Sequence, residues 1–408
     1  MKSSGPSMSR RDFLGAAAAA LAAGAAGCSP GARAVRESSG ARITRASAFR
    51  VRSERWKEVG KNSHLPSHGR FATDVVVRLE TSAGVEGVGP SRASREDAAQ
   101  LLGEDPVAWY APGDGIRSPL GHREAPLWDL VGKLLDRPAW RLIGEDGPDW
   151  VPIYDGSIYF NDLEPQYAGE EVERLIYEVD QSLERGHRAF KIKVGRGFKW
   201  MEREAGFRRD VEVVRSIARF VGPEVKLMVD ANNGYDLETT KRFLDAVGEE
   251  LYFVEEMFPE SVEEDLKLKD WLRYRGWKTL VADGESAREP AHFAPYLEAK
   301  ALDVLQGDIH VFGLGRLTEL ARLAKPAGAT LAPHNWGSFT GLYLQLVLAR
   351  GIPNFLIAEQ DPAATEVFDV SAWELREGKM RVPDLPGLGM GFRPEADPAN
   401  VEMLWEVS

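Results

Sequence analysis

The sequence predicts an α/β fold, and more narrowly a (β/α) barrel of the TIM type. The chain has 408 residues, of which 43% are hydrophobic, so it can bury the core of two domains or of a barrel with an appended domain. From Val151 onward, short apolar stretches alternate with segments of helical spacing, as in a parallel sheet whose strands are joined by helices. Polar residues suited to catalysis directly follow these apolar stretches, at the strand ends where barrel enzymes carry their active sites.

Residues 1–28 are predicted to be an export signal. Residues 9–14 (SRRDFL) have the pattern of a twin-arginine signal, residues 15–27 supply a weakly apolar segment, and residues 26–28 have the pattern of a lipoprotein cleavage box. The apolar run is too short for the roughly 20 residues of a membrane-spanning helix. Cys28 is the only cysteine, so no intrachain disulfide can form, and acylation would give this residue a use. The alternative is an unrelated basic N-terminus before an Ala-rich helix.

These features lead us to expect export by the twin-arginine route to the periplasm or cell envelope, with membrane contact only through a lipid on Cys28. Residues 29–41, rich in Ser, Gly, Ala and Arg, would then form a tether. The formal net charge of -12 disfavours a nucleic-acid partner, because such a surface needs clustered Lys and Arg.

Residues 42–150 have a different pattern from the rest of the chain. Residues 43–51 and 73–80 are predicted strands, and residues 126–143 have the spacing of a helix. Between the strands lies a polar loop at residues 53–71 with many ligand-capable side chains. Such a loop either covers a site or is simply solvated. Its notable side chains are Trp56, Lys57, His64, His68 and Arg70.

The repeating region supplies one strand candidate for each of the eight strands of a barrel. The intervening segments at residues 169–185, 210–220 and 314–325 have helical spacing. The strand candidates are residues 151–157, 189–194, 226–230, 252–255, 279–284, 304–308, 330–334 and 355–359.

Three carboxylates, Asp230, Glu255 and Glu285, end successive predicted strands. Hard oxygen ligands of this kind suit Mg²⁺, and three carboxylates that face each other without a cation would repel. The alternative is that each one is a salt-bridged strand cap. We favour Glu255 over Glu256 because it lies 25 residues beyond Asp230, and the side chain of the next residue along a strand points to the other side.

Lys191 and Lys193 are separated by one residue, so both project from the same face of a strand. Proximity to Mg²⁺ and to one another should favour the neutral amine that a lysine general base requires. The pair follows the apolar residues Ala189 and Phe190, which favours a buried location over the alternative of two solvated surface lysines.

His334 and Asp308 are predicted to form a dyad. They end the seventh and sixth predicted strands, and neighbouring strands lie about 4.8 Å apart. Asp308 can then accept a hydrogen bond from one imidazole nitrogen and leave the other to face a substrate. A lone histidine would more often belong to the core, and His187 and His310, which lie outside this register, keep that interpretation.

In order and spacing, these motifs resemble the mandelate racemase group of the enolase superfamily over roughly residues 42–395. The motifs are Lys191-Ile-Lys193, Asp230-Ala-Asn232, Glu255-Glu256, Asp283-Gly-Glu285, Asp308 and Pro333-His334-Asn335-Trp336-Gly337. Two positions depart from the usual pattern. Met257 follows the acid pair, where relatives usually have proline, and Gly307 precedes Asp308, where proline is frequent.

The resemblance implies a role for each motif. Lys193 is one acid/base group with Lys191 supporting it, and His334 with Asp308 is the other. The ligands of Mg²⁺ would be Asp230, Glu255 and Glu285. The substrate-binding residues would be Asn232 beside the metal, Glu359 at a carboxylate oxygen of the substrate, and His64 and Arg70 of the loop at residues 53–71.

The resemblance also implies the domains and the reaction. Residues 42–150 would form an α+β capping domain to which residues 380–408 return, and residues 151–379 the barrel. The enzyme would remove the proton alpha to a carboxylate through an enediolate. We favour dehydration of a sugar acid to a 2-keto-3-deoxy acid by a hydro-lyase. The alternatives are a racemase or epimerase of a hydroxy acid or amino acid derivative, and a lipid-tethered binding protein without catalysis. Homo-oligomers are common for such enzymes.

Overall fold

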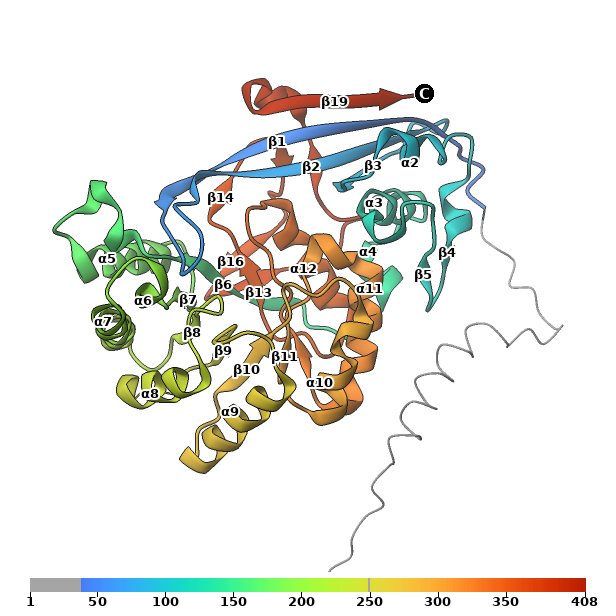
Figure 1. The fold of residues 1–408 in the computed structure, drawn as a ribbon. Helices are drawn as coiled ribbons and strands as arrows, with labels where there is room; N and C mark the ends of the chain where they lie inside the picture. Colours follow the sequence, from blue (N-terminus) through green and yellow to red (C-terminus); the bar gives the residue numbers. More distant parts are fainter. Residues whose placement is uncertain (1–37, 249) are drawn as a thin grey trace, which may run out of the picture. The chain divides into compact units, whose positions relative to one another are not determined.

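Two β-sheets organise the protein, one antiparallel and one mainly parallel (Figure 1). The computed structural model describes residues 38–248 and 250–408. The predicted twin-arginine signal, Cys28 and most of the predicted tether lie outside the described residues. Within the described ranges, no helix is both long enough and apolar enough to cross a membrane.

The antiparallel sheet is built on one long hairpin. Strand β1 (Ile43–Val59) pairs with β2 (Gly69–Thr81), and β3 (Glu86–Pro90) pairs with β2. Both predicted strands form, but they are longer than predicted, so the loop predicted at residues 53–71 shrinks to residues 60–68. Alternating charged residues along β1 lie on the exposed face of an amphipathic strand, which explains why the sequence there resembles a polar loop.

One helix packs closely on this sheet. Helix α3 (Ala125–Leu134) lies against β3, where a Cβ added to Gly89 would stand 2.7 Å from the backbone of Ala125. The predicted helix at residues 126–143 is broken, because Asp136 has a φ of 51° and Pro138 follows it. The chain resumes as α4 (Ala139–Ile143). Shorter elements nearby are α2 (Arg95–Ala99), β4 (Tyr110–Ala111) and β5 (Gly115–Ile116).

The parallel sheet contains a strand at each of the eight predicted positions, joined in chain order. The last strand pairs with the first, and an isolated parallel bridge from Leu331 to Phe355 links the seventh segment to the eighth. These pairings close the barrel. Its strands are β6 (Trp150–Ile158), β7 (Ala189–Lys193), β8 (Lys226–Asp230), β9 (Phe253–Glu255), β10 (Leu280–Asp283), β11 (Val304–Leu305), β12 (Thr330–Leu331) and β13 (Ala358–Gln360).

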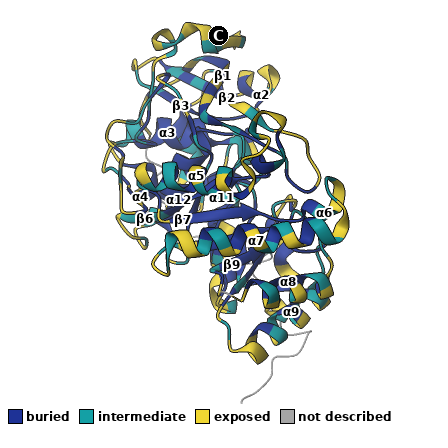
Figure 2. Cartoon of the chain, turned by 90° about the vertical axis from the view of Figure 1, so that its left-hand side faces the viewer, coloured by how far each residue is buried: buried dark blue, intermediate teal, exposed yellow. Residues whose placement is uncertain are grey.

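Helices separate these strands and form their outer cover, as Figure 2 shows for the buried strand β7 and the half-exposed helix α7. Local sequence sets their ends: the Ser261 side chain caps the start of α9, and Gly276 ends it in a left-handed conformation. The helices are α5 (Glu171–Glu184), α6 (Arg196–Lys199), α7 (Arg203–Val221), α8 (Leu237–Val247), α9 (Val262–Arg275), α10 (Ala294–Ala299), α11 (Ile309–Ala324) and α12 (Thr340–Gly351).

After the barrel, the chain returns to the antiparallel sheet. Both β14 (Ala363–Ala364) and β19 (Val401–Val407) pair with β1. Residues 38–408 cluster as one compact unit, and the boundary after residue 150 stays a prediction. The remaining strands are β15 (Phe368–Asp369), β16 (Glu374–Arg376), β17 (Lys379–Arg381) and β18 (Gly391–Phe392).

Candidate active site

One apolar layer inside the barrel fixes which residues point inward. It is a separate buried cluster with one member from each strand or strand end. Side chains alternate along a strand, so the residue two positions later in each strand forms the next layer toward the carboxyl ends. The apolar layer comprises Tyr154, Ala189, Met228, Phe253, Ala282, Val304, Ala332 and Ile357. The next layer comprises Gly156, Lys191, Asp230, Glu255, Gly284, Gln306, His334 and Glu359.

The second layer is a network of buried charges centred on Lys191. The Nζ atom of Lys191 lies 2.6 Å from Oε1 of Glu255, 2.8 Å from Oε1 of Glu359 and 3.4 Å from Oδ2 of Asp230. All four side chains are essentially inaccessible to solvent. In the described part of the chain, only ion pairs with Lys191 and Lys193 offset these three carboxylates. Burial together with Asp230 and Glu359 raises the pKa of Glu255 well above its ordinary value.

Lys193 stands one step above this layer and contacts Asp230. Burial acts to lower the pKa values of Lys191 and Lys193, but the adjacent carboxylates outweigh it and raise both above the ordinary lysine value. These directions hold for the protein without metal, so the neutral amine expected beside Mg²⁺ stays a prediction.

Gln306 is a member of the layer that the sequence analysis missed. Its Nε2 atom donates a hydrogen bond of 2.6 Å to Oε2 of Glu255. Gly156, also in this layer, leaves room for the carboxylate of Glu359, because a Cβ at this position would collide with it. Both could have been found by extending the period-two register from Val304 and Tyr154 by two residues.

Glu256 and Glu285 lie at the open side of the cluster. The expectation that Glu256 points away is wrong, because β9 ends at Glu255 and Glu256 has a φ of 41°. Its carboxylate accepts a hydrogen bond of 3.2 Å from Asn232 Nδ2. Burial, together with Glu285 and Asp230, raises the pKa of Glu256 to about 8.

The predicted dyad is present. Nδ1 of His334 lies 2.7 Å from Oδ2 of Asp308, and its Nε2 lies 3.4 Å from Oε2 of Glu285. Asp308 is itself held in place, because its other oxygen accepts from the first backbone amides of α11. Burial opposes protonation of His334, but Glu285, Asp308 and Glu359 raise its pKa to about 10.

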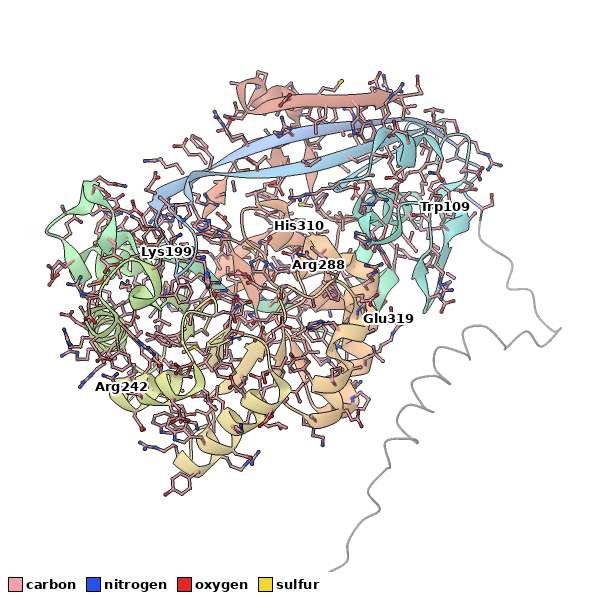
Figure 3. The ribbon with its side chains drawn as sticks, viewed as in Figure 1. Trp109, Lys199, Arg242, Arg288, His310 and Glu319 are labelled. Carbon is pink, nitrogen blue, oxygen red and sulfur yellow. The ribbon has the colours of Figure 1, made fainter. Side chains whose placement is uncertain are left out.

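The loop at residues 60–68 reaches the carboxyl ends of the barrel strands. Ser63 donates a hydrogen bond of 2.7 Å to the carbonyl oxygen of Ala231, directly after β8. Lys199, labelled in Figure 3 near the tip of the β1–β2 hairpin, donates to the carbonyl oxygen of His64. The loop is therefore anchored beside Asp230 and Asn232.

The structure does not bring His64 or Arg70 to the charged cluster. The His64 ring is exposed and packs on Phe198 with the ring centroids 4.4 Å apart. Arg70 is half-exposed and pairs with the exposed Glu54. Their substrate contacts stay predictions without structural support. His68, from the same loop, faces inward instead and contacts Tyr159 and Trp336.

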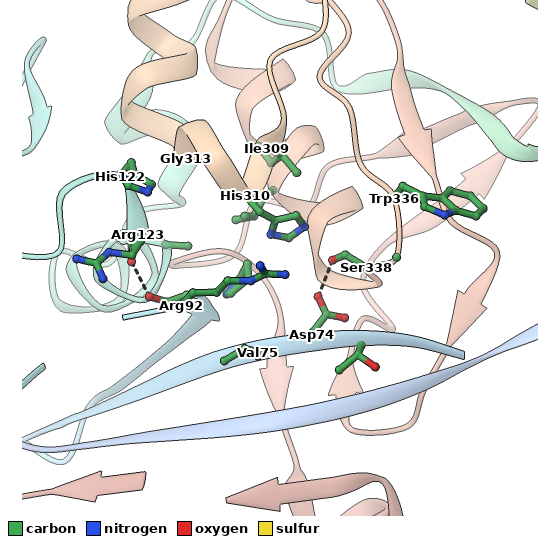
Figure 4. Close-up of a pocket in the computed structure, with 16 residues that line it drawn as sticks. Asp74, Val75, Arg92, His122, Arg123, Ile309, His310, Gly313, Trp336 and Ser338 are labelled. Carbon is green, nitrogen blue, oxygen red and sulfur yellow. Dashed lines mark hydrogen bonds between the residues drawn. The ribbon is translucent and has the colours of Figure 1, made fainter. Parts of the chain in front are cut away.

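A small cavity lies behind Trp336, between the antiparallel sheet and α11 (Figure 4). Its volume is about 60 Å³, enough for small polar molecules only. Asp74 of β2 accepts there from the Ser338 hydroxyl and from the Phe339 amide. The antiparallel sheet therefore holds the loop that follows His334.

The side chains fit Mg²⁺ in chemistry. Asp230, Glu255, Glu256 and Glu285 supply hard oxygen atoms, and Oδ1 of Asn232 is buried without a hydrogen-bond partner. The described residues nevertheless contain no group of three acidic or imidazole side chains arranged to hold a metal. Lys191 and Lys193 occupy Glu255 and Asp230 instead, so a metal would have to replace lysine contacts.

Comparison with known proteins identifies the family to which this fold belongs. Residues 174–396 match the family model described as enolase C-terminal domain-like. A solved galacturonate dehydratase from a Geobacillus species, in complex with D-galacturonate and 5-keto-4-deoxy-D-galacturonate, is 32% identical with a TM-score of 0.83. This match covers 91% of this chain and 100% of that one.

Two other relatives agree with this family. A mandelate racemase/muconate lactonizing protein from Geobacillus sp. Y412MC10, solved with magnesium and tartrate, is 32% identical with a TM-score of 0.82, covering 89% of this chain and 97% of that one. A D-xylonate dehydratase from Haloferax volcanii is 25% identical, covering 80% of this chain and 85% of that one. The predicted family and the predicted class of reaction, acid-sugar dehydration, are confirmed. The chain belongs to the enolase superfamily, in its mandelate racemase and muconate lactonizing branch.

Proposed function

We propose that this protein is a magnesium-dependent dehydratase whose substrate is a hexuronate. The observation that carries the proposal is the placement of two acid/base groups on one rim. Lys193 ends β7, whereas His334 follows β12, and strands β13 and β6 lie between them around the barrel. A substrate above the buried carboxylates would meet the two groups from different sides.

The two groups have different supports, which favours different tasks. Lys193 is bracketed by Asp230 and the ring of Tyr159, whose centroid is 5.0 Å from its Nζ atom. With Mg²⁺ bound to Asp230 in place of this contact, Lys193 would be a neutral amine and would remove the proton alpha to the carboxylate. His334 is held at Nδ1 by Asp308, so its Nε2 atom can protonate the leaving hydroxyl.

Asp230, Glu255 and Glu285 would hold the magnesium ion. Bound there, Mg²⁺ would supply positive charge where negative charge develops on the substrate carboxylate. The protein's own contribution is Lys191, which is fixed by Glu255 and Glu359 and adds a second positive charge beside the same position. The magnesium in a related solved structure supports this choice of metal.

The galacturonate dehydratase supports the choice of a hexuronate. Its product, 5-keto-4-deoxy-D-galacturonate, arises when the carbon next to the carboxylate loses a proton and the following carbon loses its hydroxyl group as water. Counted from the carboxylate, this is the same dehydration as the formation of a 2-keto-3-deoxy acid from an aldonate. The same residues can therefore serve both substrate types.

The test is turnover of purified residues 29–408 on a panel of hexuronates and aldonates with Mg²⁺. We expect a keto-deoxy product from a hexuronate, and loss of activity with chelator that Mg²⁺ restores. Activity on aldonates alone would reject the hexuronate, and full activity in metal-free protein would reject the metal. Inversion without water loss would identify an epimerase, the second candidate, which two acid/base groups on different sides also permit.

We also propose that the enzyme acts outside the cytoplasm. Residues 9–14 and Cys28 support this proposal through their sequence pattern alone. Replacement of both Arg10 and Arg11 by lysine should block export of a fused reporter, and Cys28→Ser should release the protein from the membrane. Membrane attachment that persists in Cys28→Ser would reject the lipid anchor and leave the export route intact.

A further inference from the structure

The inward-facing histidine of the loop, His68, is held in one tautomer. The indole Nε1 of Trp336 lies 3.1 Å from Nδ1 of His68. An indole N–H can only donate, so Nδ1 must accept, and the ring proton of a neutral imidazole must reside on Nε2. The hydrogen bond thus turns a side chain with two possible tautomers into a fixed donor.

The backbone and ring of His68 are also held. Arg55 forms a buried bidentate pair with Asp361, with bonds of 2.8 and 2.7 Å. From this position Arg55 donates to the carbonyl oxygens of His68, Gly69 and Phe71. The His68 ring packs edge-on against Tyr159, which stacks on Trp336 with ring centroids 4.7 Å apart. Little freedom remains for the imidazole to turn.

The fixed donor is buried and lacks an acceptor. Nε2 of His68 is inaccessible and has no hydrogen-bond partner within the described part of the chain. Its surroundings are those of the active site, because Tyr159 contacts both His68 and Lys193. Burial, Lys193 and Arg55 lower the pKa of His68 to about 4, so the ring stays neutral near pH 7. A buried donor without a partner calls for an explanation, and beside the acid/base group Lys193 a bound substrate can supply the acceptor.

We propose that His68 is a substrate-positioning residue whose Nε2–H donates a hydrogen bond to an oxygen atom of the sugar acid, beside Lys193. The proposal rests on the proposed function, because the ligand is taken to be a sugar acid. A fixed N–H donor favours a substrate with a hydroxyl or ring oxygen at this position. It disfavours a substrate with a carbon or an ammonium group there, because neither can accept the hydrogen bond. The loop at residues 60–68 therefore selects for oxygenation of the substrate carbon chain.

Kinetics on deoxygenated substrates test this role. His68→Phe keeps the aromatic packing and removes the donor, so kcat/KM on the best sugar acid should fall roughly 10- to 100-fold, mainly through KM. His68→Gln, which offers both an acceptor for Trp336 and an N–H, should recover part of the loss. The monodeoxy analogue that lacks the oxygen bound by His68 should show an equally low kcat/KM with the wild type. The His68→Phe variant should have the same kcat/KM for this analogue and for the parent substrate. His122→Phe, at a histidine outside the barrel rim, is the matched control.

A purely structural role predicts a different result. In that case His68→Phe would lower kcat/KM by the same factor for the parent substrate and every monodeoxy analogue, which would overturn the proposal. A second measurement does not depend on turnover. In the ¹⁵N spectrum of histidine-labelled protein, His68 should show the Nε2–H tautomer, and Trp336→Phe should release it. The Nε2–H resonance should shift when D-galacturonate and Mg²⁺ are added.

The two measurements separate this proposal from the proposed function. A wild-type enzyme that turns over aldonates but not hexuronates would correct the substrate, and the analogue series would then use the aldonate. An Nδ1–H tautomer of His68 would overturn the positioning role even if hexuronate turnover were efficient. A resonance that sugar acids leave unmoved would do the same.

Discussion

The barrel rim and the loop at residues 60–68 lie beside the same site but differ in the charge of their side chains. At the rim, Lys191 and Lys193 are buried among carboxylates, so every catalytic side chain carries or exchanges charge. In the loop at residues 60–68, the inward side chain is the neutral His68, set against Tyr159 and Trp336. Charge at the rim supplies reactivity, whereas the fixed neutral donor of the loop supplies selection.

This difference indicates how the two regions can change. The rim residues depend on one another, since removal of one charge leaves a buried partner unpaired. The loop residue depends on the backbone contacts of Arg55, which a different side chain at position 68 would leave in place, and on one hydrogen bond from Trp336, which only a side chain with an acceptor would keep. We therefore expect rim substitutions to stop the reaction and loop substitutions to redirect it.

The largest effect should come from the two acid/base groups. Lys193→Met and His334→Asn should each lower kcat by about 10²- to 10⁴-fold. If Lys193 removes the alpha proton, His334→Asn should still exchange that proton with deuterated water, whereas Lys193→Met should not. Proton NMR of the substrate measures this exchange.

The reverse exchange pattern would assign the alpha proton to His334 and imply a substrate of opposite configuration. Exchange that survives in the double variant would show that neither residue is the base. In that case the comparison between a reactive rim and a selective loop would fail.

The second effect concerns the acid pair Glu255 and Glu256 at the end of β9. Glu255 belongs to the inward layer, so Glu255→Gln should abolish Mg²⁺ binding measured by calorimetry. Glu256→Gln should weaken binding less, although its carboxylate lies near Asn232 and responds to Glu285. The opposite ranking would assign the ligand to Glu256 and would place the metal at the open side of the cluster.

The sequence predicted the barrel rim more accurately than the loop at residues 60–68. The barrel, the inward carboxylates and the His334–Asp308 dyad could be predicted because period-two alternation and strand-end position are local properties. Glu256 could not, because its positive φ follows from the end of a strand and not from its residue type. The ion pairs of Lys191 could not be predicted either, because they depend on carboxylates from three other strands.

The loop was predicted less well than the barrel. The sequence does not show which of His64, His68 and Arg70 faces the site, because all three are polar residues of one segment. Only tertiary contacts distinguish them. His68 faces inward because Trp336, far along the chain, donates to it. The predicted loop was also too long, because the outward positions of β1 are polar, as in any strand with one solvated face.

The third effect tests the support of the loop. Arg55→Met would leave Asp361 buried and unpaired, which typically costs about 3–5 kcal/mol. We expect a clear fall in the melting temperature, measured by calorimetry, together with a higher KM. Asp361→Asn combined with Arg55→Met should cost less than the sum of the two single changes, because the two residues interact directly. Strictly additive losses would show that the pair does not hold the loop.

The smallest effect should come from the two exposed residues that the sequence analysis placed at the substrate. Arg70 pairs with Glu54, and both side chains are at least half exposed, so the pair contributes about 0–1 kcal/mol to stability. Arg70→Ala and His64→Ala should each change kcat/KM by less than about 3-fold, because both side chains are exposed and lie against Glu54 and Phe198 and not against the charged cluster. Steady-state kinetics on the best sugar acid would measure this against His68→Phe. A loss in Arg70→Ala as large as that in His68→Phe would mean that the loop closes further over the substrate than this structure shows, and that selection is shared between exposed and buried residues.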